Sequence, residues 1–316
     1  MLLAKLATVF RGQSIIEYLD SIGSTVLSKV IGLAFISFAV FVTVATLRDF
    51  SELMVSAFFP QTPLLVFIIA IALLASWAAY EGLETIGRMA QFLLPLTALG
   101  IVLSGLLSVN DGNIENFLPL IENGFAPIIR GGITQWAFFG ETAIWLLLLP
   151  HLNQNNKNNF FMPLSVLLAG SLAVLVLFYI INALGAEMAS ARTYPFLTVV
   201  NIISLGGILE RLESVFLIIW VASNFMKIVV FFYGATYGLR HYLRNISTVV
   251  IIIPLLIITT TLSVLIFGNY LQLRAIFAPE IYGVLSSVYQ VFIPLFVAIV
   301  IFIKTLLAKH KTGTRH

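Results

Sequence analysis

The sequence predicts an all-α integral membrane protein that crosses the bilayer about eight times. Only 10% of its 316 residues are charged and 60% are hydrophobic, with a mean hydropathy of +1.04. A soluble domain carries about 25% charged residues, so this chain could not cover a water-facing surface of its size. The apolar residues also form continuous blocks of about 20, the length of a membrane-spanning α-helix. These blocks lack the apolar–polar alternation of a membrane β-barrel.

The gaps between charged residues mark the expected spans. They run over about Ser24–Leu47, Pro63–Tyr80, Arg88–Ser108, Phe125–Leu149, Phe161–Gly185, Glu213–Tyr242, Ser247–Phe267 and Gly283–Leu307. Before the first span, Ser14–Leu19 is expected to form a short amphipathic helix, unless the chain begins part-way through a longer one. The polar connection Glu187–Glu210 is expected to fold as one or two short helices.

Lys and Arg residues concentrate in the segments that lie on the same side as the N-terminus, whereas the connection between the third and fourth spans is acidic. Because positive charge marks the cytoplasmic side, we expect both termini to be cytoplasmic.

The chain has no cysteine, which excludes disulfides, thiol catalysis and Cys-ligated metals. Its four histidines lie at or beyond the ends of apolar blocks and form no spaced pair, so we expect no metal site and no cofactor. Neither a Ser/His/Asp set nor paired catalytic carboxylates suggest an enzyme, and no nucleic-acid partner is expected.

The fourth span carries the most informative polar residues. Glu141 lies near its middle, directly after Gly140, and the pair Gly131-Gly132 follows Arg130 about two turns earlier. Glycine is a poor helix former, so both glycine sites are places where the helix can open. Broken membrane helices hold substrates near the midplane, and acids within a membrane are usually functional. We therefore interpret Phe138, Phe139, Gly140 and Glu141 as a substrate-binding break; the alternative is a packing glycine and a Glu satisfied by Thr142 or a neighbouring helix.

The sixth span contains Lys227 near its centre, fourteen residues after Glu213. Ser223 and Lys227 are four residues apart, so they share a helix face, and Asn224 lies beside them. A face with small polar groups and a cation suggests a cavity lining, but a buried structural ion pair is an equally good interpretation. Lys227, Arg130 and Glu213 are therefore candidates for structural or coupling charges.

The first span adds Thr43 and Thr46 in its outer half. Threonine hydroxyls often bond to carbonyls of their own helix, and that is the simpler interpretation.

In several motifs the chain resembles the B subunit of endospore germinant receptors, the spore germination permease family of the amino acid/polyamine/organocation (APC) superfamily. The motifs are Glu17-Tyr-Leu-Asp, Gly87-Arg-Met-Ala-Gln-Phe-Leu-Leu-Pro, Gly124-Phe-Ala-Pro-Ile, Phe139-Gly-Glu, Leu149-Pro150, Tyr194-Pro195 and Leu209-Glu-Arg-Leu-Glu-Ser-Val-Phe. Each is short, but together they follow the family's order along essentially the whole chain.

The resemblance implies that residues 1–316 form one permease-like domain with an APC-type inverted-repeat fold of ten helices. The substrate would bind between the family's broken first and sixth helices. The fourth span here matches that sixth helix, which places Phe139, Gly140 and Glu141 on its break. The first and sixth spans match the family's third and eighth helices, which supports Thr43, Thr46, Ser223 and Asn224 as secondary candidates.

Counted this way, about eight of the ten helices are present, because the family's first helix and most of its second have no counterpart. Either the gene start is set at an internal Met, which we favour, or the chain is a truncated paralogue. The missing helix would supply half of an inverted-repeat site.

The functional expectation is a germinant receptor subunit that senses a small molecule, an amino acid, in the spore inner membrane. Its partners would be the lipid bilayer, a membrane subunit with soluble domains and a lipoprotein. The rival is an amino acid transporter in the cell membrane, coupled to H⁺ or Na⁺, with the same fold.

Overall fold

The computed structural model describes residues 6, 9–10, 12–21, 25–108, 112–118, 124–151, 158–202, 213–243 and 246–313. Among these residues the structure is helical and contains no β-strand. Eight helical segments are long and apolar enough to cross a membrane, which confirms the predicted number. They are Thr25–Phe58, Leu64–Glu81, Leu83–Ser108, Ala126–His151, Phe161–Ala191, Glu213–Tyr242, Thr248–Leu265 and Pro279–Lys304.

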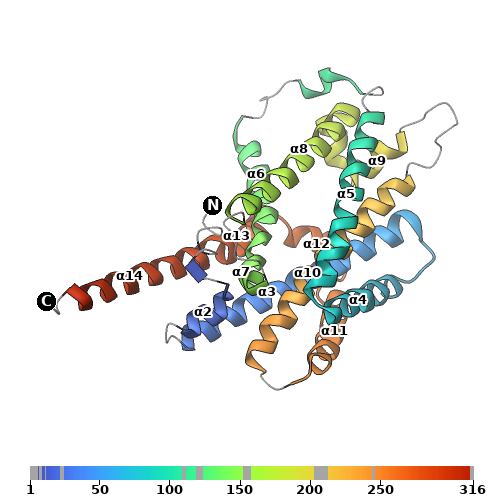
Figure 1. The fold of residues 1–316 in the computed structure, drawn as a ribbon. Helices are drawn as coiled ribbons and strands as arrows, with labels where there is room; N and C mark the ends of the chain where they lie inside the picture. Colours follow the sequence, from blue (N-terminus) through green and yellow to red (C-terminus); the bar gives the residue numbers. More distant parts are fainter. Residues whose placement is uncertain are drawn as a thin grey trace. The chain divides into compact units, whose positions relative to one another are not determined.

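Figure 1 shows the helices in chain order, with the interruptions that divide some spans. The elements are α2 (Ile15–Ser21), α3 (Thr25–Leu53), η1 (Met54–Phe58), α4 (Leu64–Glu81), α5 (Leu83–Ser108), η3 (Ile114–Phe117), α6 (Ala126–Phe139), η4 (Gly140–Ile144), α7 (Trp145–Leu148), η5 (Leu149–His151), α8 (Asn158–Ala191), α9 (Pro195–Ile202), α10 (Glu213–Tyr242), α11 (Thr248–Leu265), α12 (Tyr270–Ile276), η6 (Pro279–Gly283), α13 (Val284–Ser287), η7 (Val288–Phe292) and α14 (Ile293–Gly313). The short helix α2 confirms the expectation for Ser14–Leu19. In the connection after the fifth span, α9 is one short helix, and residues 203–210 of that connection lie outside the described residues.

The chain divides into two compact units. The first comprises Met1–Ala45, Ile128–Pro163 and Phe231–His316, and the second comprises Thr46–Pro127 and Leu164–Val230. The divisions fall inside α3, α6, α8 and α10, so these four helices each contribute to both units.

In the first unit, glycines of α10 allow close packing against α3 and η4. A side chain at Gly238 would meet Ile36 of α3 at 2.6 Å, and one at Gly234 would meet Ile144 at 2.8 Å. In a bilayer, close backbone approach of this kind is a main source of helix–helix affinity. Gly234 and Gly238 therefore allow α10 to pack closely against two different neighbouring segments.

The helix α2 is fixed at both its start and its flank. Ser14 and Glu17 form a capping box, with the Glu17 amide donating to Ser14 Oγ (3.2 Å) and the Ser14 amide donating to Glu17 Oε2 (2.9 Å). Tyr237 of α10 donates to Glu17 Oε1 (3.2 Å), and His241 Nε2 lies 2.8 Å from Asp20 Oδ2. The N-terminal segment is thus attached to the end of α10 by two side-chain contacts.

The first span is longer than predicted, because it continues through the charged residues after Leu47. Arg48 and Glu52 form an i,i+4 ion pair, with the Arg48 Nε donating to Glu52 Oε1 at 2.7 Å. Asp49, between them, experiences the positive charge of Lys227. Charge compensation within the helix and from α10 allows the helix to run through a segment that looks like a boundary in the sequence.

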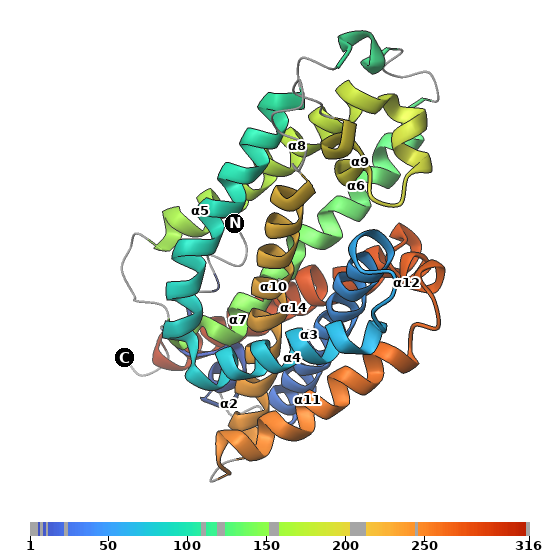
Figure 2. The same ribbon diagram turned by 90° about the vertical axis from the view of Figure 1, so that its right-hand side faces the viewer.

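In the second unit, α4 and α5 follow each other directly, as Figure 2 shows, and Gly82 is the one residue between them. Gly82 has φ +94°, a conformation that residues with a side chain rarely adopt. Further along α5, Gly105 packs directly against the ring of Tyr179 in α8. Small residues thus set the helix spacing in this unit as well.

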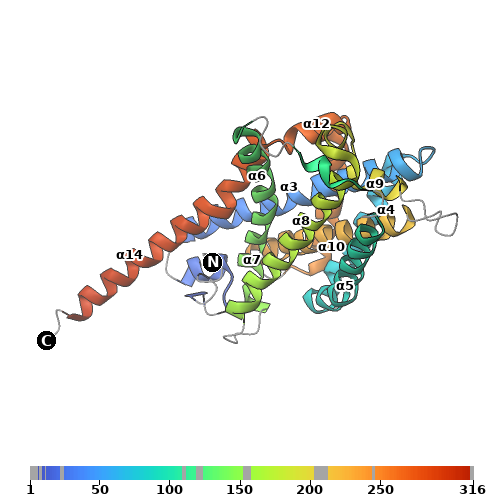
Figure 3. The same ribbon diagram turned by 90° about the horizontal axis from the view of Figure 1, so that it is seen from above.

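The last span, in the first unit, consists of alternating α-helical and wider turns. The segments η6 and η7 are π-helical and flank α13. Figures 1 and 3 show the C-terminal part of α14 extending beyond the other elements of its unit. Wider turns of this kind often occur at functional sites.

Candidate functional site

The α-helical part of the fourth span ends at Phe139, where the sequence predicts a break. The backbone tightens into the 3₁₀ turn η4 from Gly140 to Ile144, and α-helical geometry returns at Trp145. The α-helical geometry is therefore interrupted at the predicted place, but the chain tightens there and does not open, so a substrate-binding break stays a prediction. Gly131 and Gly132 do not form the second opening that the sequence suggested, because both lie within α6.

Glu141 lies in this 3₁₀ turn and is 8% exposed. The hydroxyl of Tyr282 in η6, itself 1% exposed, donates a hydrogen bond to Glu141 Oε1. A buried carboxyl group needs such a donor, since its desolvation is otherwise costly. The contact joins the helix interruption in the fourth span to the π-helical turn that begins the last span.

Gln290 in η7 contacts the fourth span about one helical turn before Glu141. Its Nε2 donates to the backbone carbonyl of Ala137 at 2.6 Å, and its amide group packs directly on Gly140, where any side chain would collide with it. Gln290 is 7% exposed, yet its Oε1 has no hydrogen-bond partner among the described residues. An unpaired buried acceptor costs about 1–3 kcal/mol, so its presence here calls for an explanation.

Aromatic rings surround the Glu141–Tyr282 contact. The rings of Phe138, Phe277 and Tyr282 lie within contact distance of one another, with centroids 5.1–5.6 Å apart. Phe41 of α3 adds a fourth ring, 6.3 Å from that of Tyr282. The cluster places the hydrogen-bonded pair in an apolar environment, in which polar interactions are stronger than in water. Phe139, the remaining residue of the predicted break, is half-buried, and its carbonyl accepts from Thr142 Oγ1 at 2.9 Å.

Arg130 pairs with Glu280 of η6, and both side chains are largely exposed. This ion pair is a second connection between the fourth and last spans. It agrees with a structural role for Arg130, and its exposure argues for a small energetic contribution.

The hydroxyl of Thr43 bonds to its own helix, as the simpler interpretation predicts. It is buried and donates to the carbonyl of Ala39 in the same helix at 2.8 Å. A hydroxyl engaged in this way keeps its two lone pairs as acceptors for a ligand but has no free donor.

The other predicted residues belong to the second unit. Thr46 is buried, Ser223 is exposed, and Asn224 Nδ2 donates to the Trp220 carbonyl of its own helix at 2.9 Å. Lys227 is half-buried and acts electrostatically on Asp49, as a structural ion pair would, whereas Glu213 is exposed at the first residue of α10. Their assignment to substrate binding or coupling stays a prediction.

Sequence reasoning missed the contribution of the last span. Tyr282 and Gln290 both contact the fourth span, and Ser286, between them, donates to the Tyr282 carbonyl at 2.6 Å. The signal was present as polar residues at positions 282, 286 and 290, although Glu280, Ser287 and Tyr289 also interrupt the apolar pattern of this span. Intervals of four residues place such groups on one helix face.

Comparison with known proteins agrees with this architecture. The sequence profile of a family described as "Spore germination protein" matches residues 1–265. Among individual proteins, the chain is 23% identical to spore germination protein KB of Bacillus subtilis (strain 168) over 262 residues, 80% of this chain and 69% of that protein. It is 24% identical to spore germination protein YndE, over 78% of this chain and 68% of that protein, from the same organism.

The putative spore germination protein YfkT of the same organism is 27% identical over 313 residues, 98% of this chain and 85% of that protein. No solved structure gives a significant match. The eight apolar helices identify an integral membrane protein of APC-permease type. Since the profile covers most of its length, the chain belongs to the spore germination protein family.

Proposed function

We propose that the chain is the ligand-sensing membrane subunit of a germinant receptor. A small-molecule germinant, most directly an amino acid, would bind at the helix interruption around Glu141. Membership of the spore germination protein family supports the germination role. We place the protein in the spore inner membrane with both termini in the cytoplasm.

The observation that carries the proposal is the pairing of two buried acceptors beside a helix break. Glu141 contributes a carboxyl group, and Gln290 Oε1 lacks a partner among the described residues. The ammonium group of an amino acid has three donors and suits such acceptors. The surrounding rings of Phe138, Phe277 and Tyr282 would contact an apolar side chain. Ligand sites commonly combine an apolar lining with a few polar groups of this kind.

Ligand binding would act through the contacts between the fourth and last spans. A ligand that binds Glu141 and Gln290 would change the hydrogen bonds that these residues make between the fourth and last spans. The ligand would therefore bind with different affinity to a conformation in which those bonds are formed and to one in which they are broken. Such a difference in affinity is the requirement for a population shift. The partner subunits would be a membrane subunit with soluble domains and a lipoprotein. They would respond to the change in conformation.

Binding and germination can be measured on the same variants. Purified protein in nanodiscs would be titrated with amino acids by calorimetry, and spores carrying each variant would be tested for germination. We expect Glu141→Gln and Gln290→Leu to weaken binding about tenfold or more, since a missing charge-assisted bond costs at least about 1.4 kcal/mol.

Gln135→Leu is the matched control, because Gln135 is exposed on the same span. It should bind and germinate like the wild type. Gln290→Leu removes the unpaired acceptor and also the hydrogen bond to the Ala137 carbonyl, so its unfolding temperature is measured beside its affinity to separate lost binding from lost folding. Unchanged affinity in both Glu141→Gln and Gln290→Leu would show that the site lies elsewhere.

A secondary transporter of amino acids, driven by H⁺ or Na⁺, is the second candidate. The observation in its favour is the buried carboxyl group of Glu141, since carboxyl groups within membrane spans serve as proton carriers in transporters. Uptake of labelled amino acid into proteoliposomes under an imposed ion gradient distinguishes the two. Accumulation against a concentration gradient would establish transport, whereas binding without accumulation supports a receptor.

A further inference from the structure

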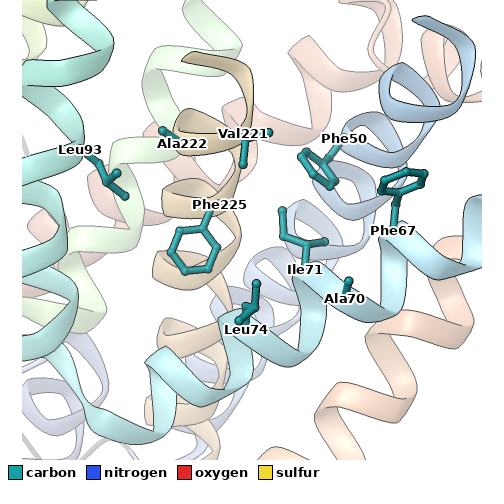
Figure 4. Close-up of a pocket in the computed structure, with 9 residues that line it drawn as sticks. All are labelled: Phe50, Phe67, Ala70, Ile71, Leu74, Leu93, Val221, Ala222 and Phe225. Atoms are coloured by element: carbon teal, nitrogen blue, oxygen red, sulfur yellow. The ribbon is translucent and has the colours of Figure 1, made fainter. Parts of the chain in front are cut away.

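The second unit contains a cavity of about 360 Å³ whose lining includes none of the residues around Glu141. Four helices contribute to it: α3, α4, α5 and α10. Figure 4 shows the nine lining side chains gathered around the space, and none of them carries a nitrogen or oxygen atom. The lining residues are Phe50, Phe67, Ala70, Ile71, Leu74, Leu93, Val221, Ala222 and Phe225.

The lining excludes water and polar ligands. A water molecule in a cavity needs two to four polar partners, and the side chains of this cavity offer none. Burying a polar or charged ligand here would leave its hydrogen-bonding groups unpaired, at a cost of several kcal/mol. The occupant must therefore be apolar over the part that enters.

The location of the cavity indicates which apolar molecule could enter it. All nine lining residues lie within segments that are long and apolar enough to cross a membrane, which favours a position beside the bilayer hydrocarbon. Leu74 is 53% exposed and Val221 is 37% exposed, so the rim includes side chains that face outward. Exposed apolar side chains at this depth lie among lipid acyl chains.

The size of the cavity favours one chain over a whole lipid. Ligand pockets range from about 300 to 1,000 Å³, and 360 Å³ is at the lower end of that range. A phospholipid headgroup would need polar partners that the lining lacks. Three phenylalanine rings, from Phe50, Phe67 and Phe225, form rigid walls that a flexible chain could fill.

We propose that this cavity is a binding site for a single acyl chain of a membrane phospholipid. The chain would contact α3, α4, α5 and α10 at once and add apolar contacts between helices, which in a bilayer associate mainly through packing. The site is independent of the ligand site around Glu141, so either can fail without affecting the other.

The test uses the full chain in nanodiscs of phosphatidylethanolamine and phosphatidylglycerol, with a small fraction of phosphatidylglycerol that carries a diazirine on one acyl chain. Photolabelled peptides are quantified by mass spectrometry. We expect labelling of peptides that contain Phe50, Phe67 and Phe225 to saturate as the probe fraction rises. Labelling that rises linearly, and equally on exposed apolar positions outside the cavity, would mean annular lipid contact only and would overturn the proposal.

Two neighbouring leucines provide a matched pair of variants. Leu74 lines the cavity and is 53% exposed, whereas Leu73 is 52% exposed and does not line it. Leu74→Trp places a large ring at the rim and should lower cavity labelling about fivefold, as expected for loss of about 1 kcal/mol of apolar contact. Leu73→Trp should leave it unchanged. Equal effects of the two variants, or no label in the cavity of the wild type, would also overturn the proposal.

Discussion

Tyr282 and Glu141 are 141 residues apart in the chain, and the tyrosine hydroxyl donates a hydrogen bond to Oε1 of the glutamate. The bond closes a contact between a 3₁₀ turn in the fourth span and a π-helical turn in the last span. Neither turn would be expected from an uninterrupted membrane helix. Their meeting point joins two departures from regular α-helical geometry, and the buried amide of Gln290 contacts the same part of the fourth span.

Tyr282→Phe should lower the thermal unfolding midpoint of the detergent-solubilised protein. The change removes one buried hydrogen bond and leaves a carboxyl acceptor without it, at a cost of about 1–3 kcal/mol. Tyr289→Phe is the control, because no described residue forms a hydrogen bond with the Tyr289 hydroxyl, and its ring stacks on Phe38. A double-mutant cycle with Glu141→Gln should give a coupling free energy clearly different from zero; additive effects would contradict the contact.

Gly140→Ala should destabilise the protein, whereas Gly131→Ala should not. A methyl group at Gly140 would overlap the amide of Gln290, and overpacking of a buried site costs about 1–3 kcal/mol. Among the described residues, no atom outside the helix's own backbone lies within 4 Å of the position that a methyl group at Gly131 would take. The higher helix propensity of alanine should therefore make that change neutral or stabilising by up to about 1 kcal/mol. Unfolding midpoints in detergent measure both, and the reverse order would refute this packing.

Glu52→Gln and Glu84→Gln form a second matched pair, because each removes the acid of an i,i+4 Arg–Glu pair. Arg48 and Glu52 are 7% and 18% exposed, whereas Arg88 and Glu84 are 76% and 79% exposed. Removing one partner of a largely buried pair should cost more than about 1 kcal/mol, while the exposed pair should contribute less than about 0.5 kcal/mol. Equal shifts of the unfolding midpoint would show that the Arg48 charge is compensated without Glu52.

Ser14→Ala should loosen α2 by removing its N-cap. Loss of a Ser cap costs about 1 kcal/mol, so the amides of Ile15–Ser21 should exchange with deuterium about fivefold faster. Ser21→Ala changes an exposed serine at the other end of the helix and serves as the control. Unchanged exchange in Ser14→Ala would mean that the contacts from Tyr237 and His241 alone hold α2 in place.

The sequence was sufficient to predict the membrane spans and the interruption at Gly140. Spans are visible because each requires about 20 consecutive apolar residues, and the interruption is visible because glycine precedes an acid within one. The end of the first span was wrong because Arg48 and Glu52 satisfy each other along the helix, which a count of charges does not reveal. Tyr282 and Gln290 were missed because their partners are distant in the chain, and only their four-residue spacing with Ser286 marked them.

The two π-helical turns of the last span also constrain how this protein can evolve. Tyr282 lies in the first turn and Gln290 in the second, and each holds one more residue than an α-helical turn would. Deleting or inserting a residue between them would rotate one side chain by about 100° away from the fourth span. Side chains along this stretch can be exchanged, but a change in its length would move Tyr282 or Gln290 away from its partner in the fourth span. Among homologues, the number of residues between the positions of Tyr282 and Gln290 should therefore be conserved more strictly than their identities.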